Sequence, residues 1–348
     1  MLIGIIGAGI SGLTAGRLLA KAGHEVRIFE KSRGYGGRLA TRYDEDNHEI
    51  RFDHGTPHFS GTDPRFQGFI DELTQKNILK KWAETFNYWD GKNLQSMHPE
   101  KVSTNYYYAP EGLNTIGKYL SRWSDVHTES KVIGITYLGA KNDKKRAWML
   151  NFENFETVEV DAVIVATPAV QAYGLIMNSQ DETIFRSVIS KIDEISYNPK
   201  YSLMLTYDDA PKPDWKGIFC NDDTIHWISN ESSKRDNAGK TTLVCHSKGE
   251  FTRDHILNSG DLTIIKNEMI LRLRTIIGDW AGKYDQSQIH LWRYSQPRTF
   301  LDRDYVEIGV DNAPVAIIGD YMRSGGTVEQ AYISGIELAN DWAEKLPR

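Results

Sequence analysis

Apolar positions at the start of the chain follow the pattern of a strand, a helix and a second strand. Residues 2–6 form an uninterrupted apolar run, as expected of a strand buried on both faces. Residues 10–22 then place their leucines on one helical face, and Gly23 stands where the helix should end. Residues 26–29 have the pattern of a second strand. The beginning of the chain therefore predicts a β-α-β unit of a parallel sheet.

Later segments extend this first sheet and add a second one. Near-continuous apolar runs at residues 161–166 and 315–318 predict two more strands of the first sheet, and residues 113–120 predict a helix. Alternating patterns predict strands near residues 132 and 147. Strands of a second sheet are predicted at 197–207, 225–229 and 241–247, with helices around 251–257 and 262–277. Alternation also predicts strands within 86–108 and at 290–297.

The length of 348 residues exceeds that at which one hydrophobic core usually stops growing, so we expect two domains. We predict an α/β, Rossmann-type nucleotide-binding domain with an inserted α+β substrate domain. The predicted nucleotide-binding domain comprises residues 1–75, 112–175 and 298–348. The predicted substrate domain comprises residues 76–111 and 176–297.

Three glycines follow the first strand at the spacing of a dinucleotide-binding turn. Gly7 permits the tight turn, Gly9 lets the backbone approach a pyrophosphate, and Gly12 allows the helix to pack against the strand. Glu30 closes the second strand, 30 − 12 = 18 residues later, where a carboxylate accepts hydrogen bonds from a ribose. Because an acid disfavours a 2′-phosphate, FAD or NAD is expected here rather than NADP.

Residues 31–42 carry three glycines and three arginines directly after that strand. Arg38 is the arginine expected beside the cofactor, and an anion clamp is the predicted role of this loop. A solvated basic loop is the alternative. Near the end of the chain, Asp320 follows a buried strand and is expected to bind hydroxyl groups of a flavin side chain. The helix that begins near Val328 is expected to point its backbone N–H groups at the flavin ring.

Four residues are candidates for catalysis or substrate binding. His58, in the segment 52–59, is either a proton-transfer group or a structural hydrogen-bond donor. Arg293 and Tyr294 are assigned either to the substrate pocket or to packing between the domains. His246 is expected to line the same pocket. No histidine pair has the spacing of a zinc site, so no metal is predicted.

Charge and cysteine content narrow the class of partner. The formal charge of −6, with basic residues scattered along the chain, predicts no binding to nucleic acid or to anionic membranes. Only Cys220 and Cys245 occur, which excludes a disulfide scaffold and indicates a cytoplasmic protein. We also expect no signal peptide and no membrane-spanning segment. The expected partner is a small molecule.

These motifs together resemble the flavin amine oxidase superfamily. The resemblance implies a fold like that of the amine oxidases and p-hydroxybenzoate hydroxylase. The stretches KSRGYGGRLATR, ISNESSKRD and WRYSQP are more closely similar to bacterial renalases. The resemblance implies noncovalent FAD, since no cysteine follows Cys245. It also implies oxidation of dihydronicotinamide isomers of NAD(P)H to NAD(P)⁺, with O₂ reduced to H₂O₂. Oxidation of a primary or secondary amine is the alternative activity, and a flavin-binding module without turnover is a third.

The resemblance also assigns residues to the FAD site. Arg38 would contact the phosphates or the flavin edge, Val132 would meet adenine through its backbone, and Thr167 would stand near the nucleotide. The family more often has other residues at 56–58, where this chain has Thr-Pro-His. The full set expected to bind the cofactor is Gly7, Gly9, Ser11, Gly12, Glu30, Lys31, Gly37, Arg38, Thr56, Pro57, Val132, Thr167, Gly319, Asp320 and Val328.

Overall fold

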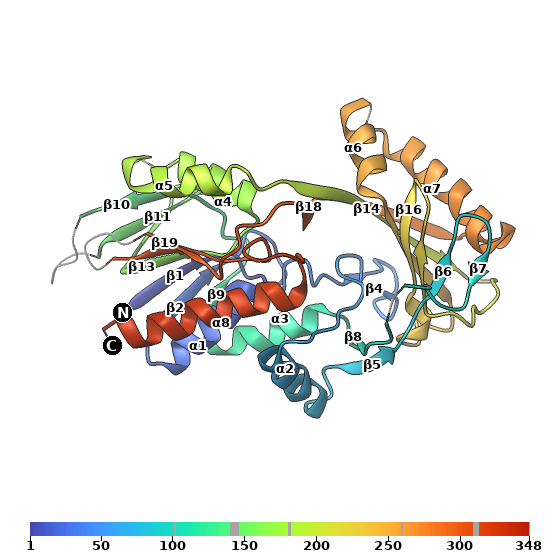
Figure 1. Cartoon of the computed structure of the whole chain (residues 1–348), viewed down its shortest axis with the longest axis horizontal. Coiled ribbons are helices and arrows are strands. Elements are labelled where there is room, and N and C mark those ends of the chain that lie inside the picture. Colours follow the sequence, from blue (N-terminus) through green and yellow to red (C-terminus); the bar gives the residue numbers. More distant parts are fainter. Residues whose placement is uncertain (101, 140–145, 180–181, 259, 309–312, 348) are drawn as a thin grey trace.

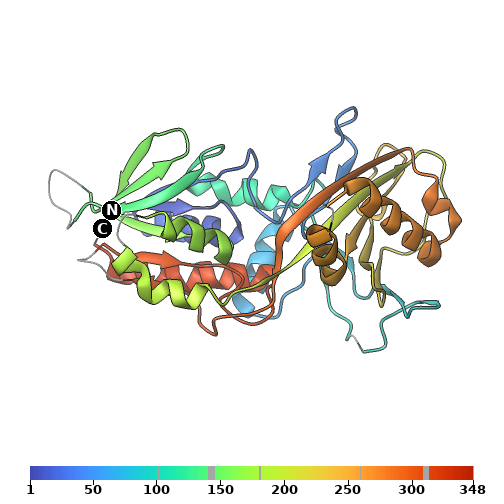
Figure 2. The same ribbon diagram turned by 90° about the horizontal axis from the view of Figure 1, so that it is seen from above.

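The computed structural model describes residues 1–348 except 101, 140–145, 180–181, 259, 309–312 and 348. Two lobes stand side by side, and the long strands β14 (Tyr197–Tyr207) and β18 (Gln286–Pro297) run between them (Figures 1 and 2). The chain ends lie close together at the far edge of the first lobe. No helix among the described residues is long and apolar enough to cross a membrane.

The first lobe is built on a mainly parallel sheet, as the apolar runs predicted. Within the described residues the sheet has six strands in the order β19-β20-β13-β1-β2-β9, of which only β19 is antiparallel to its neighbour. Fully buried runs such as that of β1 are what a sheet covered on both faces requires. The strands are β1 (Leu2–Ile6), β2 (Glu25–Phe29), β9 (Asp125–His127), β13 (Ala162–Val165), β19 (Val306–Ile308) and β20 (Val315–Ile317).

One face of this sheet is covered by helices. Helices α1 (Ile10–Lys21) and α8 (Val328–Lys345) pack side by side, with α3 (Asn114–Leu120) and its extension η1 (Ser121–Trp123) beside them. A Cβ on Gly335 of α8 would lie only 2.5 Å from the Ser11 carbonyl oxygen of α1, so this glycine permits the close helix contact. Helix α2 (Pro64–Gln75) contributes Phe66 and Phe69 to the same core.

The opposite face carries a small antiparallel sheet and two helices. Strands β10 (Val132–Tyr137), β11 (Trp148–Phe152) and β12 (Thr157–Val160) form this sheet, so the strands predicted near residues 132 and 147 do not join the large one. Helices α4 (Ala169–Met177) and α5 (Glu182–Ile192) pack with them. The predicted division assigned the α5 segment to the substrate domain. Phe185, Val188 and Ile192 instead pack in the core of the first lobe, because α5 lies against α4 and β19.

The second lobe is built on a mostly antiparallel sheet. Seven strands of the described chain are ordered β18-β14-β17-β16-β15-β6-β7, and the strands predicted at 197–207, 225–229, 241–247 and 290–297 are confirmed as members. The remaining strands are β17 (Thr241–Ser247), β16 (Ile225–Asn230), β15 (Gly217–Cys220), β6 (Asn87–Trp89) and β7 (Leu94–Gln95), and the turn η2 (Glu231–Ser233) follows β16.

The two helices predicted around 251–257 and 262–277 are confirmed as α6 (Gly249–Asn258) and α7 (Leu262–Ile277), and η3 (Asp279–Gly282) follows them. Helix α7 covers one face of the sheet through Ile265, Met269 and Leu273. Two short antiparallel strand pairs join the lobes near the other face. They are β3 (Arg42–Tyr43) with β4 (Arg51–Phe52), and β5 (Lys80–Ala83) with β8 (Tyr106–Tyr108).

Candidate functional site

The glycine turn after β1 has the geometry that a pyrophosphate requires. Gly7 adopts φ +107°, and a Cβ on Gly12 would lie 2.3 Å from the Gly7 carbonyl oxygen. A Cβ on Gly9, by contrast, would meet no atom within 4 Å, so the backbone there borders open space. Helix α1 begins at the next residue without a side-chain cap, and its first N–H groups can therefore receive an anion. The turn fits a bound dinucleotide.

The carboxylate of Glu30 is fixed beside this turn. Glu30 is 7 % exposed, and its Oε2 accepts a hydrogen bond of 2.9 Å from the Ala8 N–H. Its Oε1 accepts bonds from the N–H (2.9 Å) and the hydroxyl group of Ser32. The carboxylate is therefore held at the end of β2, which is the location that the predicted ribose contact requires.

The loop rich in glycine and arginine lies against the same turn. The Gly36 N–H donates to the Ala8 carbonyl oxygen at 2.8 Å, and Gly36 forms a bridge with Gly9. Gly37 adopts φ +59°, and a Cβ there would lie 3.2 Å from the Gly9 Cα. Lys31, at the start of the loop, is exposed. The fold thus brings the two predicted cofactor segments together.

Arg38 and Asp320, 282 residues apart, form a two-pronged ion pair. The Arg38 nitrogens lie 2.7 and 2.8 Å from the Asp320 oxygens, and Arg38 also donates to the Ser295 carbonyl oxygen at 3.0 Å. Burial opposes the charge on Arg38, but Asp320 outweighs it and the pKa of Arg38 is raised. The sequence predicts Arg38 at the phosphates or the flavin edge and Asp320 at the ribityl chain. The structure shows them as one charged unit that joins the two ends of the chain.

Three further predicted cofactor residues lie around this unit. At the end of β13, the Thr167 Oγ1 atom is buried without a hydrogen-bond partner among the described residues. A Cβ on Gly7 would lie 3.3 Å from the Thr167 Cγ2, so this unmatched hydroxyl group adjoins the glycine turn. Gly319 donates to the Ser334 hydroxyl at 3.1 Å, and Thr327 caps α8, which starts at Val328. An unmatched polar atom in this place fits a cofactor that brings its own oxygen atoms.

For two other residues of the predicted set, the structure gives a position and a degree of burial. Ser11 is buried in the first turn of α1, and Val132 is half-buried at the start of β10. Their predicted contacts with the cofactor remain predictions.

The segment 55–57 is fixed between the two lobes. The Thr56 N–H donates to the Arg38 carbonyl oxygen at 2.8 Å. A Cβ on Gly55 would lie 2.1 Å from that same oxygen and 3.3 Å from the Trp292 Cζ2 of β18, so only glycine fits. On the other side, Lys234 donates to the Pro57 carbonyl oxygen at 2.7 Å. Residues of both lobes therefore fix this segment next to Arg38.

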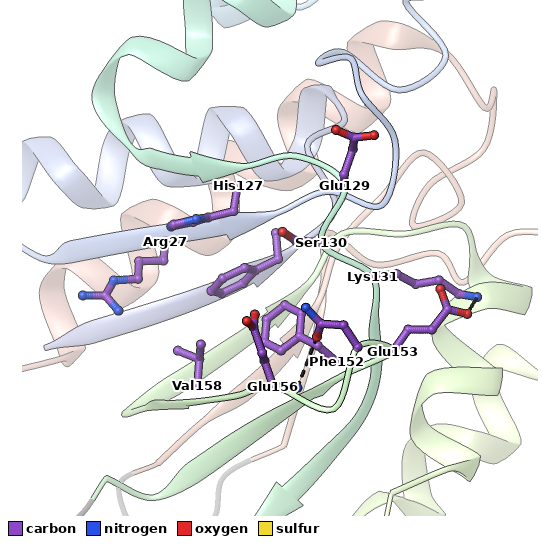
Figure 3. A pocket seen from close by; sticks show the side chains of 11 residues that line it. Arg27, His127, Glu129, Ser130, Lys131, Phe152, Glu153, Glu156 and Val158 are labelled. Atoms are coloured by element: carbon purple, nitrogen blue, oxygen red, sulfur yellow. Dashed lines mark hydrogen bonds and ion pairs between the residues drawn. The ribbon is translucent and has the colours of Figure 1, made fainter.

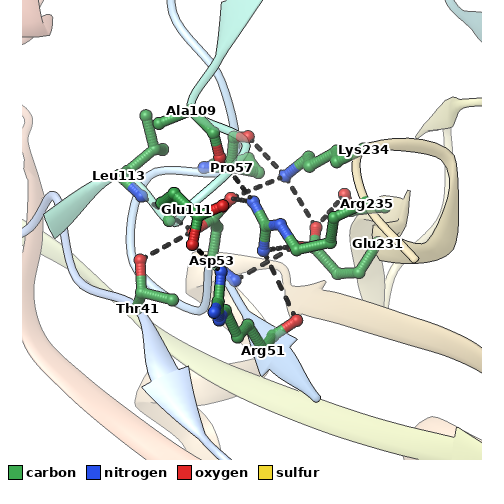
Figure 4. A network of polar contacts seen from close by, with 12 residues as sticks. Thr41, Arg51, Asp53, Pro57, Ala109, Glu111, Leu113, Glu231, Lys234 and Arg235 are labelled. Atoms are coloured by element: carbon green, nitrogen blue, oxygen red, sulfur yellow. Dashed lines mark hydrogen bonds and ion pairs between the residues drawn. The ribbon is translucent and has the colours of Figure 1, made fainter. Parts of the chain in front are cut away.

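Lys234 belongs to a buried ion network with Asp53, Glu231 and Arg235 (Figure 4). The Lys234 Nζ lies 2.7 Å from Glu231 and 3.3 Å from Asp53, and Arg235 lies 2.6 Å from Asp53. Side-chain exposure is at most 6 % for all four. Burial would raise the pKa of Asp53, but the charges of Arg235 and Lys234 outweigh it and lower that pKa. The network is electrically neutral and connects segment 52–57 to η2.

His58 lies inside a group of aromatic side chains. Its ring centroid is 4.8 to 6.3 Å from five other rings, which come from β5, β8, β15, β16 and the chain between β5 and β6. These rings belong to Trp82, Phe86, Tyr106, Phe219 and Trp227. Such packing favours the structural alternative for His58 over proton transfer.

One face of the seven-stranded sheet is turned toward segment 52–57, and we call it the inner face. Side chains alternate along each strand, and Leu203, Cys245 and Leu291 pack in the core beneath α7. Their neighbours in sequence therefore point to the inner face. The inner-face residues include Met204 and Val244, which pack against Ile50 and Phe52. They also include Lys200 and Ser202 of β14, His246 of β17, and Gln288, His290 and Trp292 of β18.

His54 lies over the inner face and is bonded to it. The Trp292 Nε1–H donates to the His54 carbonyl oxygen at 2.9 Å, and His246 Nε2 lies 3.2 Å from the same oxygen. The rings of His54, His290 and Trp292 have centroids 4.7 to 5.3 Å apart. Burial, then His290 and Arg42, lower the pKa of His54 to about 3. Burial and then Lys200 lower that of His246.

The four candidates for catalysis are thus not brought together. His246 is on the inner face, whereas His58 lies in the aromatic group. Tyr294 packs against Tyr197 with ring centroids 5.7 Å apart, next to the core of the first lobe. Arg293 is exposed on the opposite face of β18. Arg293 therefore lies apart from His246, and the packing alternative describes Tyr294 better than the pocket alternative.

Lys200 is a functional candidate that the sequence analysis missed. Burial alone lowers its pKa from 10.5 to about 8. The register of the sheet pairs it with Trp292. The sequence pattern of β14 could have indicated it. The polar residues Lys200 and Ser202 alternate there with apolar residues that face the core.

Replacing Lys200 with methionine should raise the melting temperature at pH 7. Because the pKa of Lys200 is lowered on folding, the charged side chain destabilises the folded state, and this cost has its full size below pH 8. This cost disappears as the pH rises from 8 toward 10.5. The gain measured by thermal unfolding should therefore shrink between pH 7 and pH 9.5. Lys212→Met, at an exposed site, is the control, and an equal gain at both pH values would contradict the assignment.

A separate cavity of about 360 Å³ lies at the edge of the first lobe (Figure 3). It opens between β2, β9 and the β11–β12 hairpin, and Phe29, His127 and Phe152 are among its lining residues. Arg27, Lys131 and several carboxylates surround these rings. None of the predicted site residues lines it. Elsewhere, no group of three or more His, Cys, Asp or Glu residues in the described ranges could hold a metal ion.

Comparisons with known proteins agree with this arrangement. The model of the NAD(P)-binding Rossmann-like domain matches residues 5–73, and that of the flavin containing amine oxidoreductase family matches residues 95–341. Cyclohexylamine oxidase from Brevibacterium oxydans has a TM-score of 0.75 at 13 % identity, with 99 % of both chains covered. Putrescine oxidase bound to putrescine has a TM-score of 0.71 at 13 % identity, covering 99 % of this chain and 100 % of that one. At such identities the likeness shows the fold alone.

Relatives by sequence match shorter stretches. The 4-hydroxybenzoate brominase (decarboxylating) of Pseudoalteromonas luteoviolacea is 23 % identical over 171 residues, 47 % of this chain and 25 % of that protein. A 4,4′-diapophytoene desaturase of Staphylococcus aureus is 54 % identical over 39 residues, 11 % of this chain and 8 % of that protein. The matches thus span a quarter or less of these relatives.

The family match defines the class of the protein as a flavin-dependent oxidoreductase. The chain belongs to the flavin containing amine oxidoreductase family, whose model matches more than half of it.

Proposed function

We propose that this protein is a renalase-like oxidase that binds FAD without a covalent bond. It would take hydride from dihydronicotinamide isomers of NAD(P)H. In the overall reaction one dihydronicotinamide, one O₂ and one proton give NAD(P)⁺ and H₂O₂. Bound FAD would supply the chemistry, because a flavin accepts hydride and passes electrons to O₂. The chain would supply binding, orientation and exclusion of competing reactions.

The proposed cofactor residues are those assembled around the glycine turn. The turn at Gly9 would receive the pyrophosphate, Glu30 the ribose, and Arg38 with Asp320 the central part of the cofactor. Noncovalent binding is supported by the positions of both cysteines, which lie in the seven-stranded sheet, and Cys245 packs beneath α7. Burial raises the pKa of Cys220 and of Cys245, so both are protonated thiols of low reactivity.

The observation that carries the substrate proposal is the ring group of His54, His290 and Trp292 beside Gly55. A dihydropyridine is a flat, neutral hydride donor, and its oxidation requires positioning rather than a base. His54 and His246, with strongly lowered pKa values, are neutral and poor bases at pH 7. Lys200, with a pKa of about 8, is mainly protonated and would repel an alkylammonium ion. The surface thus suits a neutral ring better than an amine.

Rapid mixing of the anaerobic holoprotein with dihydronicotinamide isomers should bleach the flavin absorbance within the dead time or within seconds. Putrescine and cyclohexylamine should leave it unchanged over the same period. Admission of air should then restore the colour and produce one H₂O₂ per substrate oxidised. Bleaching by the amines alone would replace this proposal by the amine oxidase alternative.

A further inference from the structure

Two cations close to the inner face have no carboxylate partner among the described residues. Arg42 has one hydrogen bond, to the Gln288 Oε1 at 3.3 Å, and is half-buried. For Lys200, burial is the sole cause of the pKa change, without an opposing carboxylate. The neighbouring cations differ, since Arg38 and Arg51 each pair with a carboxylate. A partly buried cation without a counter-ion is costly and is commonly kept for binding.

The register of the sheet places these cations around the histidines. Lys200 pairs with Trp292, and Ser202 stands between His290 on β18 and His246 on β17. Arg42 reaches the same row through Gln288, which precedes His290 by one inner-face position. The cations therefore flank a compact group of ring nitrogens.

Two polar atoms within this group are unmatched. The Ser202 Oγ and the His54 Nδ1 are buried, and neither has a hydrogen-bond partner in the described part of the chain. Ser202 is fully buried, and His54 is 6 % exposed. An unsatisfied buried polar group destabilises the folded protein, so its presence in a cluster indicates a partner that arrives from outside.

Every charged group that faces the histidines lowers their pKa values, except Asp53. Burial and Arg42 lower the pKa of His290, and Lys200, His226 and His54 add to burial in lowering that of His246. Asp53 raises the pKa of His54. The Asp53 carboxylate, however, is bonded to Arg235, Lys234, Thr41 and the Leu113 N–H. The net potential at the inner face is therefore positive.

We propose that Arg42, Lys200 and His290 form a subsite for a phosphate group of the substrate. This inference rests on the proposed function and names the part of the substrate that these residues hold. The phosphate would lie over His290, between Arg42 on the Gln288 side and Lys200 on the Trp292 side. The nicotinamide ring would lie beyond Trp292, beside Gly55. Charge-assisted hydrogen bonds to phosphate oxygens would then replace the missing counter-ions.

Proton uptake should accompany phosphate binding. A bound anion favours the protonated forms of His290 and Lys200, whose pKa values are lowered in the free protein. Calorimetry of pyrophosphate binding in two buffers of different ionisation enthalpy would measure this uptake. Because the pKa of Lys200 is about 8 in the free protein, we expect uptake around and above pH 8 in the native holoprotein, and heats that do not depend on the buffer there would overturn the proposal.

The decisive variant is Arg42→Gln, which keeps a polar side chain but removes the charge. It should raise KM for the dihydronicotinamide mononucleotide and dinucleotide by roughly tenfold to a hundredfold, the scale of one lost charged hydrogen bond. The rate for dihydronicotinamide riboside, which has no phosphate, should change less than about twofold. Arg274→Gln makes the same charge change on α7, beneath the opposite face, and is the matched control. Equal losses for riboside and nucleotides would overturn the proposal.

Two further measurements test the phosphate subsite independently of the proposed function. If no dihydronicotinamide is oxidised, the proposed function fails, but the calorimetry with pyrophosphate still decides the subsite. Weaker pyrophosphate binding in Arg42→Gln and unchanged binding in Arg274→Gln support it, and no binding to the native holoprotein at millimolar pyrophosphate overturns it. If Arg42→Gln fails to fold, Lys200→Gln should weaken pyrophosphate binding in the same way.

Discussion

Replacing Lys234 with methionine should lower the free energy of unfolding by about 3–5 kcal/mol. The variant leaves Glu231 and Asp53 buried with a single cation, Arg235, to balance them. It also leaves the Pro57 carbonyl oxygen without its donor and removes the ammonium group 4.6 Å from the Trp82 ring centroid. Urea unfolding at pH 7 would measure the loss. Lys240→Met, in a surface pair with Asp208, is the matched control and should cost at most about 1 kcal/mol.

The pH dependence of this loss has a defined sign. Because the pKa of Asp53 is lowered on folding, its ionised form stabilises the native state above the unfolded pKa of about 3.9, and this contribution disappears at lower pH. Without Lys234 the contribution is smaller. The difference between the native protein and the variant should therefore be largest above pH 4 and shrink in acid.

A double variant separates the charge balance from the anchoring of Pro57. Lys234→Met with Glu231→Leu removes one charge of each sign and restores a neutral, apolar interior, so much of the lost stability should return. The Pro57 carbonyl oxygen still lacks its donor. If segment 55–57 must be held for catalysis, turnover should stay low although stability recovers. Recovery of both would mean that the network acts through stability alone.

Replacing Gly9 with valine should abolish tight FAD binding and leave the fold intact. A Cβ at this position meets no atom within 4 Å, and the backbone φ of −75° is one that any residue adopts. The side chain would instead occupy the space in which the pyrophosphate is expected. The dissociation constant for FAD, titrated into apoprotein, should rise at least about a hundredfold, which is roughly 2.7 kcal/mol.

The control for this variant lies in the neighbouring loop. Gly34 also has open space around its Cβ and no left-handed φ, so Gly34→Val inserts the same side chain away from the turn. Both variants should unfold as the native apoprotein does, and Gly34→Val should bind FAD normally. Normal FAD affinity in Gly9→Val would show that the turn does not receive the cofactor.

The sequence pattern predicted those helices and strands whose structure depends mainly on residues close in sequence. The strand, glycine turn and helix at residues 2–21 follow from contiguous residues, and so do the inner strands of both sheets. The placement of α5 was not predictable in this way. Its apolar residues would suit either lobe, and only the surface offered by α4 and β19 decides which one they cover.

In the candidate site, too, some features could be predicted from contiguous residues and others depend on tertiary contacts. By itself the sequence predicted the glycine turn after β1 and the position of the carboxylate at Glu30, because these depend on glycine spacing and strand order over a few tens of residues. The class of flavin-dependent oxidoreductase followed from the resemblance of motifs along the chain to a known family. Only the tertiary structure decided that Arg38 pairs with Asp320, that Lys234 holds Pro57, and that Arg293 points away from His246. It also revealed Arg42 and Lys200 on either side of His290. The physical reason is that a charge acquires its role from its surroundings. In a folded chain those surroundings come from segments hundreds of residues apart.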